Sequence, residues 1–488
     1  MATTDGAIAQ GMEIPPAGLA DHKPSKLVKV LYSLGQMAQS GGFDTAIGFI
    51  FFYYTAVLGL SGALVGAALA ISLAFDALVD PLIGSFSDNI HSPLGRRLPL
   101  MIGATPLVAL SIGFLFSPPH GLGQTGLFAW LTVTSVAARS LISLFNVPYI
   151  ALGAEMAQDY AERTSVVVYR AIAGIVSGVV CTALGFIVFF SKGGLQRPDG
   201  YPGYGWSIAA ILLVCMATCC LGVWRYAARL PQPDQVAGSI WRRLPGEVAE
   251  VFANRSFRVL FISLVLTFVA VGVNATLNNH AYVYVWRLKS ETIQFLGYAY
   301  LFGILIGVPI APVLQKGLEK RDVVLVGLGL LCAALLVLPI LRAMGVYVPT
   351  GDAALPPLEF NSFVAGVGVG FASIAYPSMM ADAADEHEHL FGRRREGLYF
   401  SGLGFGAKAA SGLGVLVAGV CLDLIRFPKE VAGQVGVVLP HDVQTRLVLI
   451  WGPGAAAVCV VSMVLLVGYA ITRKRHDEIS EALRVKRG

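Results

Sequence analysis

The chain has 488 residues, of which 56% are hydrophobic and only 13% are charged, and its mean hydropathy is +0.69. A soluble protein of this length would form about three domains, but this composition excludes a soluble protein and is typical of the membrane class. The net charge of +5 needs no nucleic-acid partner, because the basic residues follow a topological pattern.

Apolar stretches near or above the roughly 20 residues that cross a bilayer recur along the whole chain. We predict twelve spanning helices, at residues 30–57, 61–87, 98–117, 125–155, 165–190, 204–228, 257–285, 292–315, 322–344, 357–384, 397–425 and 446–472. Most of the 35 Lys and Arg residues lie in the tails and in the loops after even-numbered spans. The positive-inside bias therefore predicts that both termini are cytoplasmic. The short loops fit a bacterial inner (cytoplasmic) membrane.

A polar stretch with three prolines, 230–256, separates the first six spans from the last six. It holds a periodic segment, Ile240–Phe252, which predicts an amphipathic helix at the cytoplasmic membrane surface. A plain linker is the alternative interpretation. We divide the chain into a cytoplasmic tail at 1–29, a six-helix bundle at 30–229, the linker at 230–256, a second six-helix bundle at 257–472 and a basic cytoplasmic tail at 473–488.

The two halves repeat similar features in the same order. The run Asn146–Tyr149 followed by Glu155 in the first half matches the run Ala375–Pro377 followed by Asp382 in the second. Internal repeats with a substrate cavity near the membrane midplane are typical of secondary transporters. The predicted fold class is an all-α membrane protein with twelve transmembrane helices in two pseudo-symmetric six-helix bundles, the major facilitator fold.

Acidic and basic residues gather at the predicted cytoplasmic ends of the spans. The candidate gating residues are Asp88, Arg96, Arg97, Asp382, Asp385 and Arg394. Exposed ion pairs contribute about 0–1 kcal/mol each, which suits a gate that reopens in every transport cycle. We therefore predict ion pairs between the halves that close the cytoplasmic side. The alternative is that the arginines only reflect the positive-inside bias.

The span at 61–87 carries two carboxylates, Asp76 and Asp80, one helical turn apart on the same face. Charge at mid-bilayer costs roughly 2.5–3.5 kcal/mol per residue on insertion scales, and two close carboxylates repel unless they share a cation or a proton. The pair therefore predicts a site for H⁺ or Na⁺, with both aspartates as the metal ligands if the ion is Na⁺. Structural salt bridges to Arg170 or Lys408 are the alternative.

Four further polar side chains lie in apolar spans. Arg139 either neutralises Asp44 or binds an anionic substrate, and the sequence does not decide between these roles. Asn274 and Asn278 lie one turn apart in the seventh span. They suit a hydroxyl-rich ligand, or alternatively hydrogen bonds between helices.

Several motifs occur in a fixed order along the chain. They are Asp76-x-x-x-Asp80-Pro-x-x-Gly84, Gly95-Arg96-Arg97-x-Pro99, Asn146 to Glu155, Asp159 to Arg170, and Asp382 to Lys408. Together they resemble the glycoside–pentoside–hexuronide:cation symporters, the melibiose permease family within the major facilitators. The resemblance covers most of the chain.

The resemblance implies roles for particular residues. It implies that Asp76 and Asp80 hold the coupling cation, and that Ser143 supplies a hydroxyl where the family has a threonine. It also implies that Asn146 meets the substrate, and that Arg170 and Lys408 line the polar cavity.

Four positions depart from the family pattern, and one of them is Asn146, which stands where the family has an aspartate. Ser40 replaces an aspartate, with Asp44 one turn later as a candidate substrate ligand. Val79 replaces an asparagine of the cation site, and this loss of an amide oxygen favours H⁺ over Na⁺. Ile150 replaces a sugar-stacking tryptophan, which argues against a melibiose-type galactoside.

The segments Phe405–Gly412 and Val147–Leu152 also resemble the sodium-dependent lysophospholipid transporter branch of the family. The predicted function is symport of a glycoside, uronide or related sugar with H⁺ or Na⁺ by alternating access. Transport of a lysophospholipid or another anionic amphiphile is the alternative. We expect a small-molecule substrate, a lipid bilayer around a monomer, no other cofactor, and no enzyme activity, because the eight histidines form no catalytic set.

Overall fold

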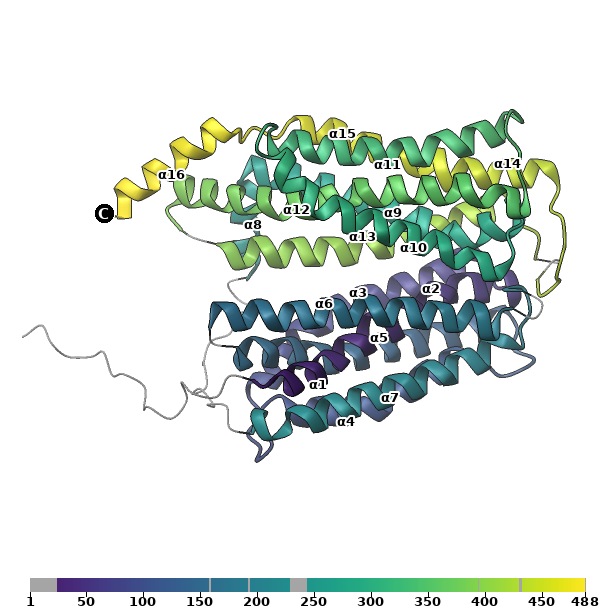
Figure 1. Cartoon of the computed structure of the whole chain (residues 1–488), viewed down its shortest axis with the longest axis horizontal. Coiled ribbons are helices and arrows are strands. Elements are labelled where there is room, and N and C mark those ends of the chain that lie inside the picture. The colour runs from purple at the N-terminus through teal and green to yellow at the C-terminus, as the bar shows by residue number, and fades with distance from the viewer. Residues whose placement is uncertain are drawn as a thin grey trace, which may run out of the picture.

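The computed structural model describes residues 24–157, 159–191, 194–228, 244–393, 395–429 and 432–487. Within these ranges all regular elements are helices. They form two bundles that lie side by side, with long helices running in a common direction (Figure 1). The predicted all-α architecture is confirmed.

The first half of the chain forms one bundle of six spanning segments. Its first segment is a continuous helical run with two π-helical parts. The elements of this half are α1 (Lys26–Gln36), η1 (Met37–Asp44), α2 (Thr45–Phe52), η2 (Tyr53–Val57), α3 (Gly62–Asp88), α4 (Leu98–Leu115), α5 (Gln124–Met156), α6 (Tyr160–Ala183), η3 (Leu184–Phe189) and α7 (Gly200–Ala227).

The second half forms the other bundle. Its elements are α8 (Leu244–Ala253), α9 (Arg255–His280), η5 (Ala281–Val285), α10 (Ser290–Leu314), α11 (Lys320–Ala343), η6 (Gly351–Ala354), α12 (Leu355–Phe391), α13 (Glu396–Leu424), α14 (His441–Leu449), η8 (Ile450–Gly454), α15 (Ala455–Val467) and α16 (Arg473–Arg487). Within the described ranges, eleven helices are long and apolar enough to cross a membrane. The run from α1 to η2, divided by its π-helical parts, supplies the twelfth predicted span.

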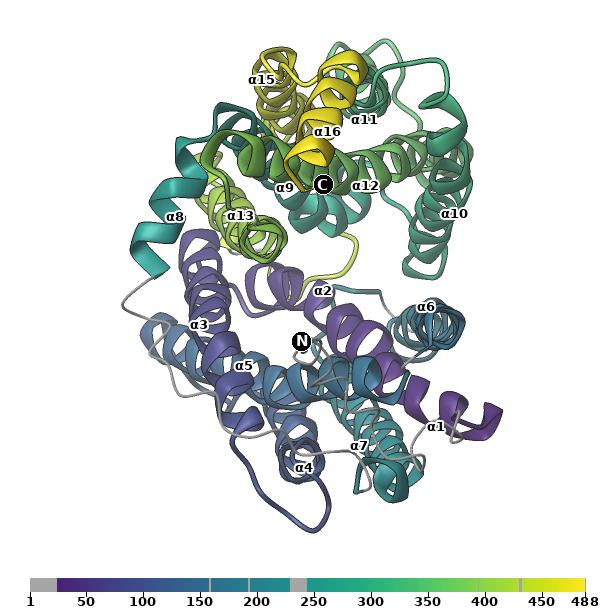
Figure 2. The ribbon, with the colours of Figure 1, turned by 90° about the vertical axis from the view of Figure 1, so that its left-hand side faces the viewer.

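The beginning of α1 and the end of α16 lie at the same end of the molecule, which we call the terminal end (Figures 1 and 2). Helix α8 also lies there, beside the beginning of α13 (Figure 2). Residues 230–243 of the predicted linker lie outside the described residues. The part of the predicted amphipathic segment that is described, from Leu244, is helical.

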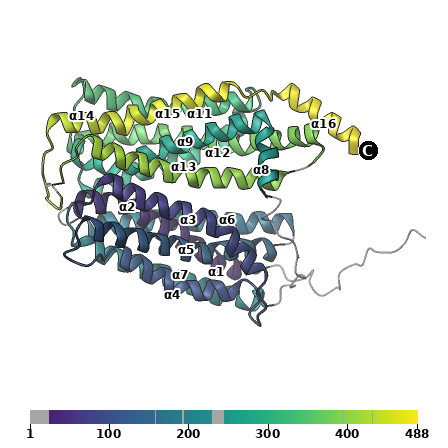
Figure 3. The ribbon, with the colours of Figure 1, turned by 180° about the vertical axis from the view of Figure 1, so that it is seen from behind.

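The two halves meet mainly along α3 and α13, which Figure 3 shows side by side. A Cβ atom on Gly419 would lie 2.1 Å from the carbonyl oxygen of Gly62, so only glycine permits this approach. Small residues allow close packing of membrane helices in the same way. Nearer the terminal end, Gly404 has open space around it. The two bundles lie farther apart at the terminal end than at the opposite end (Figure 1).

At the opposite end, side chains connect the halves directly. The Asp423 carboxylate on α13 accepts hydrogen bonds from the backbone N–H groups of Gly62 and Ala63, at 2.9 and 3.0 Å. These groups belong to the first turn of helix α3, where unpaired N–H groups and the helix dipole favour an anion. Thr55 and His280, both buried, form a 2.9 Å hydrogen bond between the halves. This end of the molecule is closed by specific contacts.

We predict that Gly419→Ala lowers the free energy of unfolding by about 1–3 kcal/mol, because the added methyl group forces α3 and α13 apart. Thermal unfolding of the purified protein in detergent measures this loss. Gly103→Ala on α4 is the matched control, because its Cβ would meet nothing within 4 Å. An equal loss in both variants would contradict the proposed steric contact.

Candidate functional site

Asp76 and Asp80 lie on the face of α3 that meets α5 and α13. The hydroxyl of Ser143 on α5 donates a 2.6 Å hydrogen bond to Asp76 Oδ1. Lys408 Nζ on α13 donates at 2.9 Å to Asp76 Oδ2 and also bonds Asp80 Oδ2. The Asp76 side chain is only 7% exposed. The two carboxylates of the first half therefore share one ammonium group from the second half.

This geometry distinguishes between Arg170 and Lys408, the two residues that the sequence offered as salt-bridge partners of the aspartates. Lys408 pairs with both aspartates, whereas Arg170 bonds to Gln36. The structure thus places Lys408 in the acidic cluster and not in the amide-lined cavity described below. The predicted roles of Asp76, Asp80 and Ser143 in binding H⁺ or Na⁺ stay predictions. All three side chains are brought together as that hypothesis requires.

Asp44 and Arg139 extend this cluster. Gln39 Nε2 donates a 3.3 Å hydrogen bond to Asp44 Oδ1. The guanidinium carbon of Arg139 lies 6.0 Å from the centre of the ring of Phe43, the neighbour of Asp44 in the chain. Asp44 ends the π-helical part η1, a kind of irregularity that is frequent at functional sites.

Some buried polar atoms beside the cluster have no hydrogen-bond partner among the described residues. They are Asp80 Oδ1, Arg139 Nε, Ser140 Oγ and Asn146 Oδ1. Unsatisfied polar atoms are costly in a membrane interior and call for an explanation. Asn146, predicted to meet the substrate, lies on α5 three residues from the cation-site Ser143. These free acceptors and donors make the region competent to bind an additional ion or a polar group.

Arg170 lies on α6, apart from the acidic pair. Its Nη2 donates a 2.7 Å hydrogen bond to Gln36 Oε1, and its guanidinium carbon lies 5.1 Å from the centre of the Tyr149 ring. No carboxylate lies within ion-pair distance of Arg170 among the pairs found in the described part of the chain. An intramembrane cation held this way is available to an anionic group.

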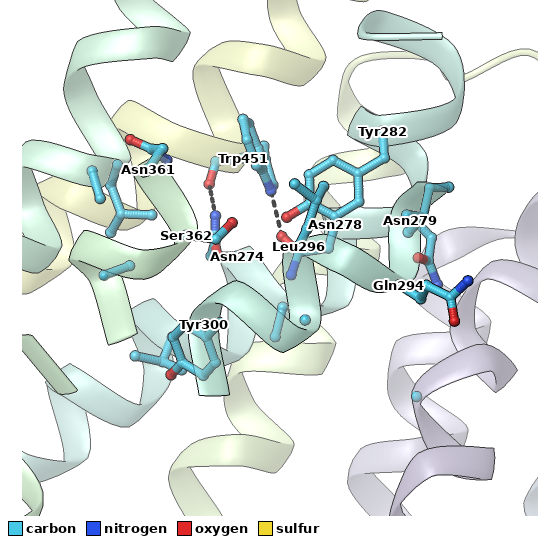
Figure 4. A pocket seen from close by; sticks show the side chains of 18 of the residues that line it. Asn274, Asn278, Asn279, Tyr282, Gln294, Leu296, Tyr300, Asn361, Ser362 and Trp451 are labelled. Carbon is cyan, nitrogen blue, oxygen red and sulfur yellow. Dashed lines mark hydrogen bonds between the residues drawn. The ribbon is translucent and has the colours of Figure 1, made fainter. Parts of the chain in front are cut away.

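A cavity of about 320 Å³ lies mainly in the second half and is lined by the predicted Asn274 and Asn278 (Figure 4). Asn274 Nδ2 donates to the Trp451 carbonyl oxygen at 3.0 Å, and the Trp451 indole donates to Asn278 Oδ1 at 2.7 Å. These amides therefore join helices and also face the cavity, and their role in binding a ligand stays a prediction. We call this space the amide pocket.

Other polar residues of the amide pocket were missed by the sequence analysis. They are Tyr282, Gln294, Tyr300, Asn361, Ser362 and Trp451, and Asn279, beside Asn278 in the same amide-rich run, also lines the pocket (Figure 4). Two of the missed residues come from α10, two from α12 and one each from η5 and η8, so no local motif marks them. The only available signal was the presence of an amide in an otherwise apolar span, as at Gln294 and Asn361.

The candidate gating residues that are described form ion pairs inside each half. Arg96 and Arg97 both reach Glu155, at 2.6 and 2.9 Å, and Arg97 also pairs with Asp88. In the second half, Lys320 lies 2.7 Å from Asp382.

The partners of the second-half acids differ from those expected from the sequence. His476 of α16 lies 3.4 Å from Asp382 and 3.5 Å from Asp385. The arginines expected to pair with these acids follow Gly392, whose φ of 69° ends α12. Beyond this turn, Nη2 of Arg395 lies 3.9 Å from Oε2 of Glu250 on α8. Arg394 lies outside the described residues. The gating role of these residues stays a prediction.

We predict that Glu155→Gln lowers stability by about 1–3 kcal/mol, because it removes the carboxylate that accepts from both arginines and leaves the buried Arg97 guanidinium less well paired. Thermal unfolding measures the change. The control is Glu478→Gln, which removes the partner of an exposed arginine and should cost less than about 1 kcal/mol. Similar losses in both variants would contradict a specific structural role for Glu155.

Comparison with known proteins extends these observations. Residues 31–473 match the family model described as MFS/sugar transport protein. An uncharacterized symporter of Synechocystis is 25% identical, over 94% of this chain and 96% of its own length. The isoprimeverose transporter of Lactiplantibacillus pentosus is 24% identical, over 80% of this chain and 79% of its own.

A solved structure of a bacterial homologue of the iron transporter ferroportin, in an inward-facing state, has the same fold. It aligns with a TM-score of 0.63 at 16% identity, over 91% of this chain and 99% of that one. The predicted fold, two six-helix bundles of the major facilitator type, is confirmed by this likeness and by the family match.

Proposed function

The chain belongs to the MFS/sugar transport protein family, and from this premise we propose that it is a cation-coupled symporter of a hydroxyl-rich sugar or glycoside. The expectation that it is a transporter and not an enzyme is confirmed by the family and by relatives named as symporters and transporters. The observation that carries the proposal is the position of Lys408, between two carboxylates of the other half.

The amide pocket supports the sugar part of the proposal. Its described lining includes amides, hydroxyls and the Trp451 ring, and none of its lining residues is charged. Sugar hydroxyls both donate and accept hydrogen bonds, and amide side chains do the same. A neutral sugar ring suits this pocket better than a uronate, because Arg170 and Lys408 do not line it. A relative named as an isoprimeverose transporter also supports a sugar substrate.

The proposed orientation places the terminal end in the cytoplasm, as the positive-inside bias indicates. With this orientation we take the described state to be open toward the cytoplasm, because the two bundles lie farther apart at that end (Figure 1). The opposite end is closed by the contacts of Asp423 and of His280. Alternating access then requires these contacts to break while the cytoplasmic ends come together.

Lys408 explains how an ion can be coupled to this motion. Its ammonium group is a tethered monovalent cation that lies between Asp76 and Asp80 and offsets one of their two negative charges in the unloaded protein. A bound H⁺ or Na⁺ would take over this role and release the link between the halves. The two carboxylates would otherwise repel in a medium of low dielectric constant. Coupling thus becomes an exchange of one cation for another.

The charge balance of the cluster supports one cation per cycle. Its ionisable members are Asp76, Asp80 and Lys408, and we count Asp44 and Arg139 with them because Arg139 lies beside the ring of Phe43, the neighbour of Asp44 in the chain. Three carboxylates and two basic groups leave one negative charge when all are ionised, so one bound H⁺ or Na⁺ makes the five groups neutral together, with Lys408 still counted after it has moved away from the aspartates. Net charge in a membrane interior is costly. On this account Arg139 serves to neutralise Asp44, rather than to bind an anionic substrate.

We predict that Asp76→Asn and Asp80→Asn each reduce gradient-driven sugar accumulation at least about tenfold, because each variant removes a ligand of the cation. Proteoliposomes with imposed Na⁺ or pH gradients are tested with radiolabelled methyl glycosides of xylose, glucose and glucuronic acid. Downhill exchange of the same sugar should survive in both variants. Full accumulation in both variants would remove these residues from the coupling site.

We predict that Lys408→Met makes the protein more responsive to the coupling ion, because the tethered competitor is gone. If the ion is Na⁺, saturating Na⁺ should raise the melting temperature of the variant by at least about 2 °C more than that of the wild type. If the coupling ion is H⁺, lowering the pH should instead raise the melting temperature of the variant more than that of the wild type. Lys320→Met, which removes the ammonium partner of Asp382, is the control and should show neither effect. A Lys408→Met variant that responds to neither ion would argue against the exchange mechanism.

A further inference from the structure

A second cavity adjoins the amide pocket. It has a volume of about 640 Å³ and runs along one face of α6, from Val167 to Thr182, opposite α10. At 1.5 Å per residue this face is about 22 Å long. Thr182 and Gly297 line both cavities, so the two spaces meet between α6 and α10. We call the second space the α6 groove.

The lining of the α6 groove differs from that of the amide pocket. Its α6 face consists mainly of small or apolar residues, and α10 adds Tyr298 and Leu301. Arg170 and Gln36 lie together toward the terminal end of the groove. The groove is thus an apolar channel that begins at a hydroxyl-binding pocket and contains a single cation.

Two glycines keep this groove open. A Cβ on Gly178 or on Gly297 would meet nothing within 4 Å. By contrast, a Cβ on Gly303 or Gly366, between α10 and α12, would lie 2.2 or 2.1 Å from a backbone oxygen. Glycines in membrane helices commonly allow helices to pack closely, and those of the second pair do so. Gly178 and Gly297 instead border empty space, which larger side chains would fill.

We infer that the α6 groove holds the apolar aglycone of a glycoside whose sugar ring lies in the amide pocket. This inference rests on the proposed function and narrows its substrate class to glycosides with an extended apolar substituent. The continuity of the two cavities selects this occupant, because one molecule with a polar and an apolar end fills both. Burial of the aglycone adds affinity in proportion to its apolar area.

The test compares methyl and 4-methylumbelliferyl β-glycosides of the same sugar, for xylose, glucose and glucuronic acid. Equilibrium binding to the full-length protein in nanodiscs is measured, with empty nanodiscs to subtract partition into lipid. We expect the larger aglycone to improve affinity at least about tenfold, or about 1.4 kcal/mol. Gly178→Leu should abolish this advantage and leave the affinity for the methyl glycoside unchanged.

The matched control is Gly103→Leu, an exposed glycine of another spanning helix that also has open space. It should retain the full advantage of the larger aglycone. The inference is overturned if the wild type shows no such advantage, if Gly178→Leu keeps it, or if Gly178→Leu weakens both glycosides equally. It is also overturned if Gly178→Leu reduces the amount of phospholipid bound to the protein but does not change the binding of either glycoside. If no glycoside of either kind binds or is transported, the proposed function itself fails, which is a different result.

Discussion

The structure depends on one interaction across the two halves, the contact of the Lys408 ammonium with Asp76 and Asp80. This contact lies between two different parts of α13. On one side Gly419 packs closely against Gly62 of α3, and on the other a Cβ on Gly404 would meet nothing within 4 Å. Removing one partner of an ion pair in a largely apolar region is costly, because it leaves the other charge unpaired. A device that exchanges its positive partner for a mobile cation can therefore change the contact between the halves without leaving the two carboxylates unpaired.

The two halves divide the work of the site. The first half supplies the carboxylates, Arg139 and Arg170, and the second half supplies the neutral amide pocket together with Lys408. The α6 groove lies where the halves face each other at α10. A substrate placed in both cavities would thus touch both halves, as alternating access requires.

Hydropathy alone predicted the spanning segments well, because a membrane interior forces each crossing backbone to satisfy its hydrogen bonds within a helix. The ends were less accurate: α12 reaches Phe391 and the last span ends at Val467, five residues before the predicted boundary at 472. The π-helical parts of the first span also went unpredicted. They follow from packing against neighbouring helices, which leaves no pattern in the local sequence.

By itself the sequence determined the all-helical membrane fold, its division into halves, and the placing of Asp76 and Asp80 on one face of one helix. These features depend on composition and on spacing within a single element. Tertiary structure alone decided that Lys408, more than 300 residues away in the chain, joins them, and that Gln294, Asn361 and Trp451 share a pocket with Asn278. Such contacts join helices that are far apart in the chain, and the packing of side chains between helices, not periodicity, selects them.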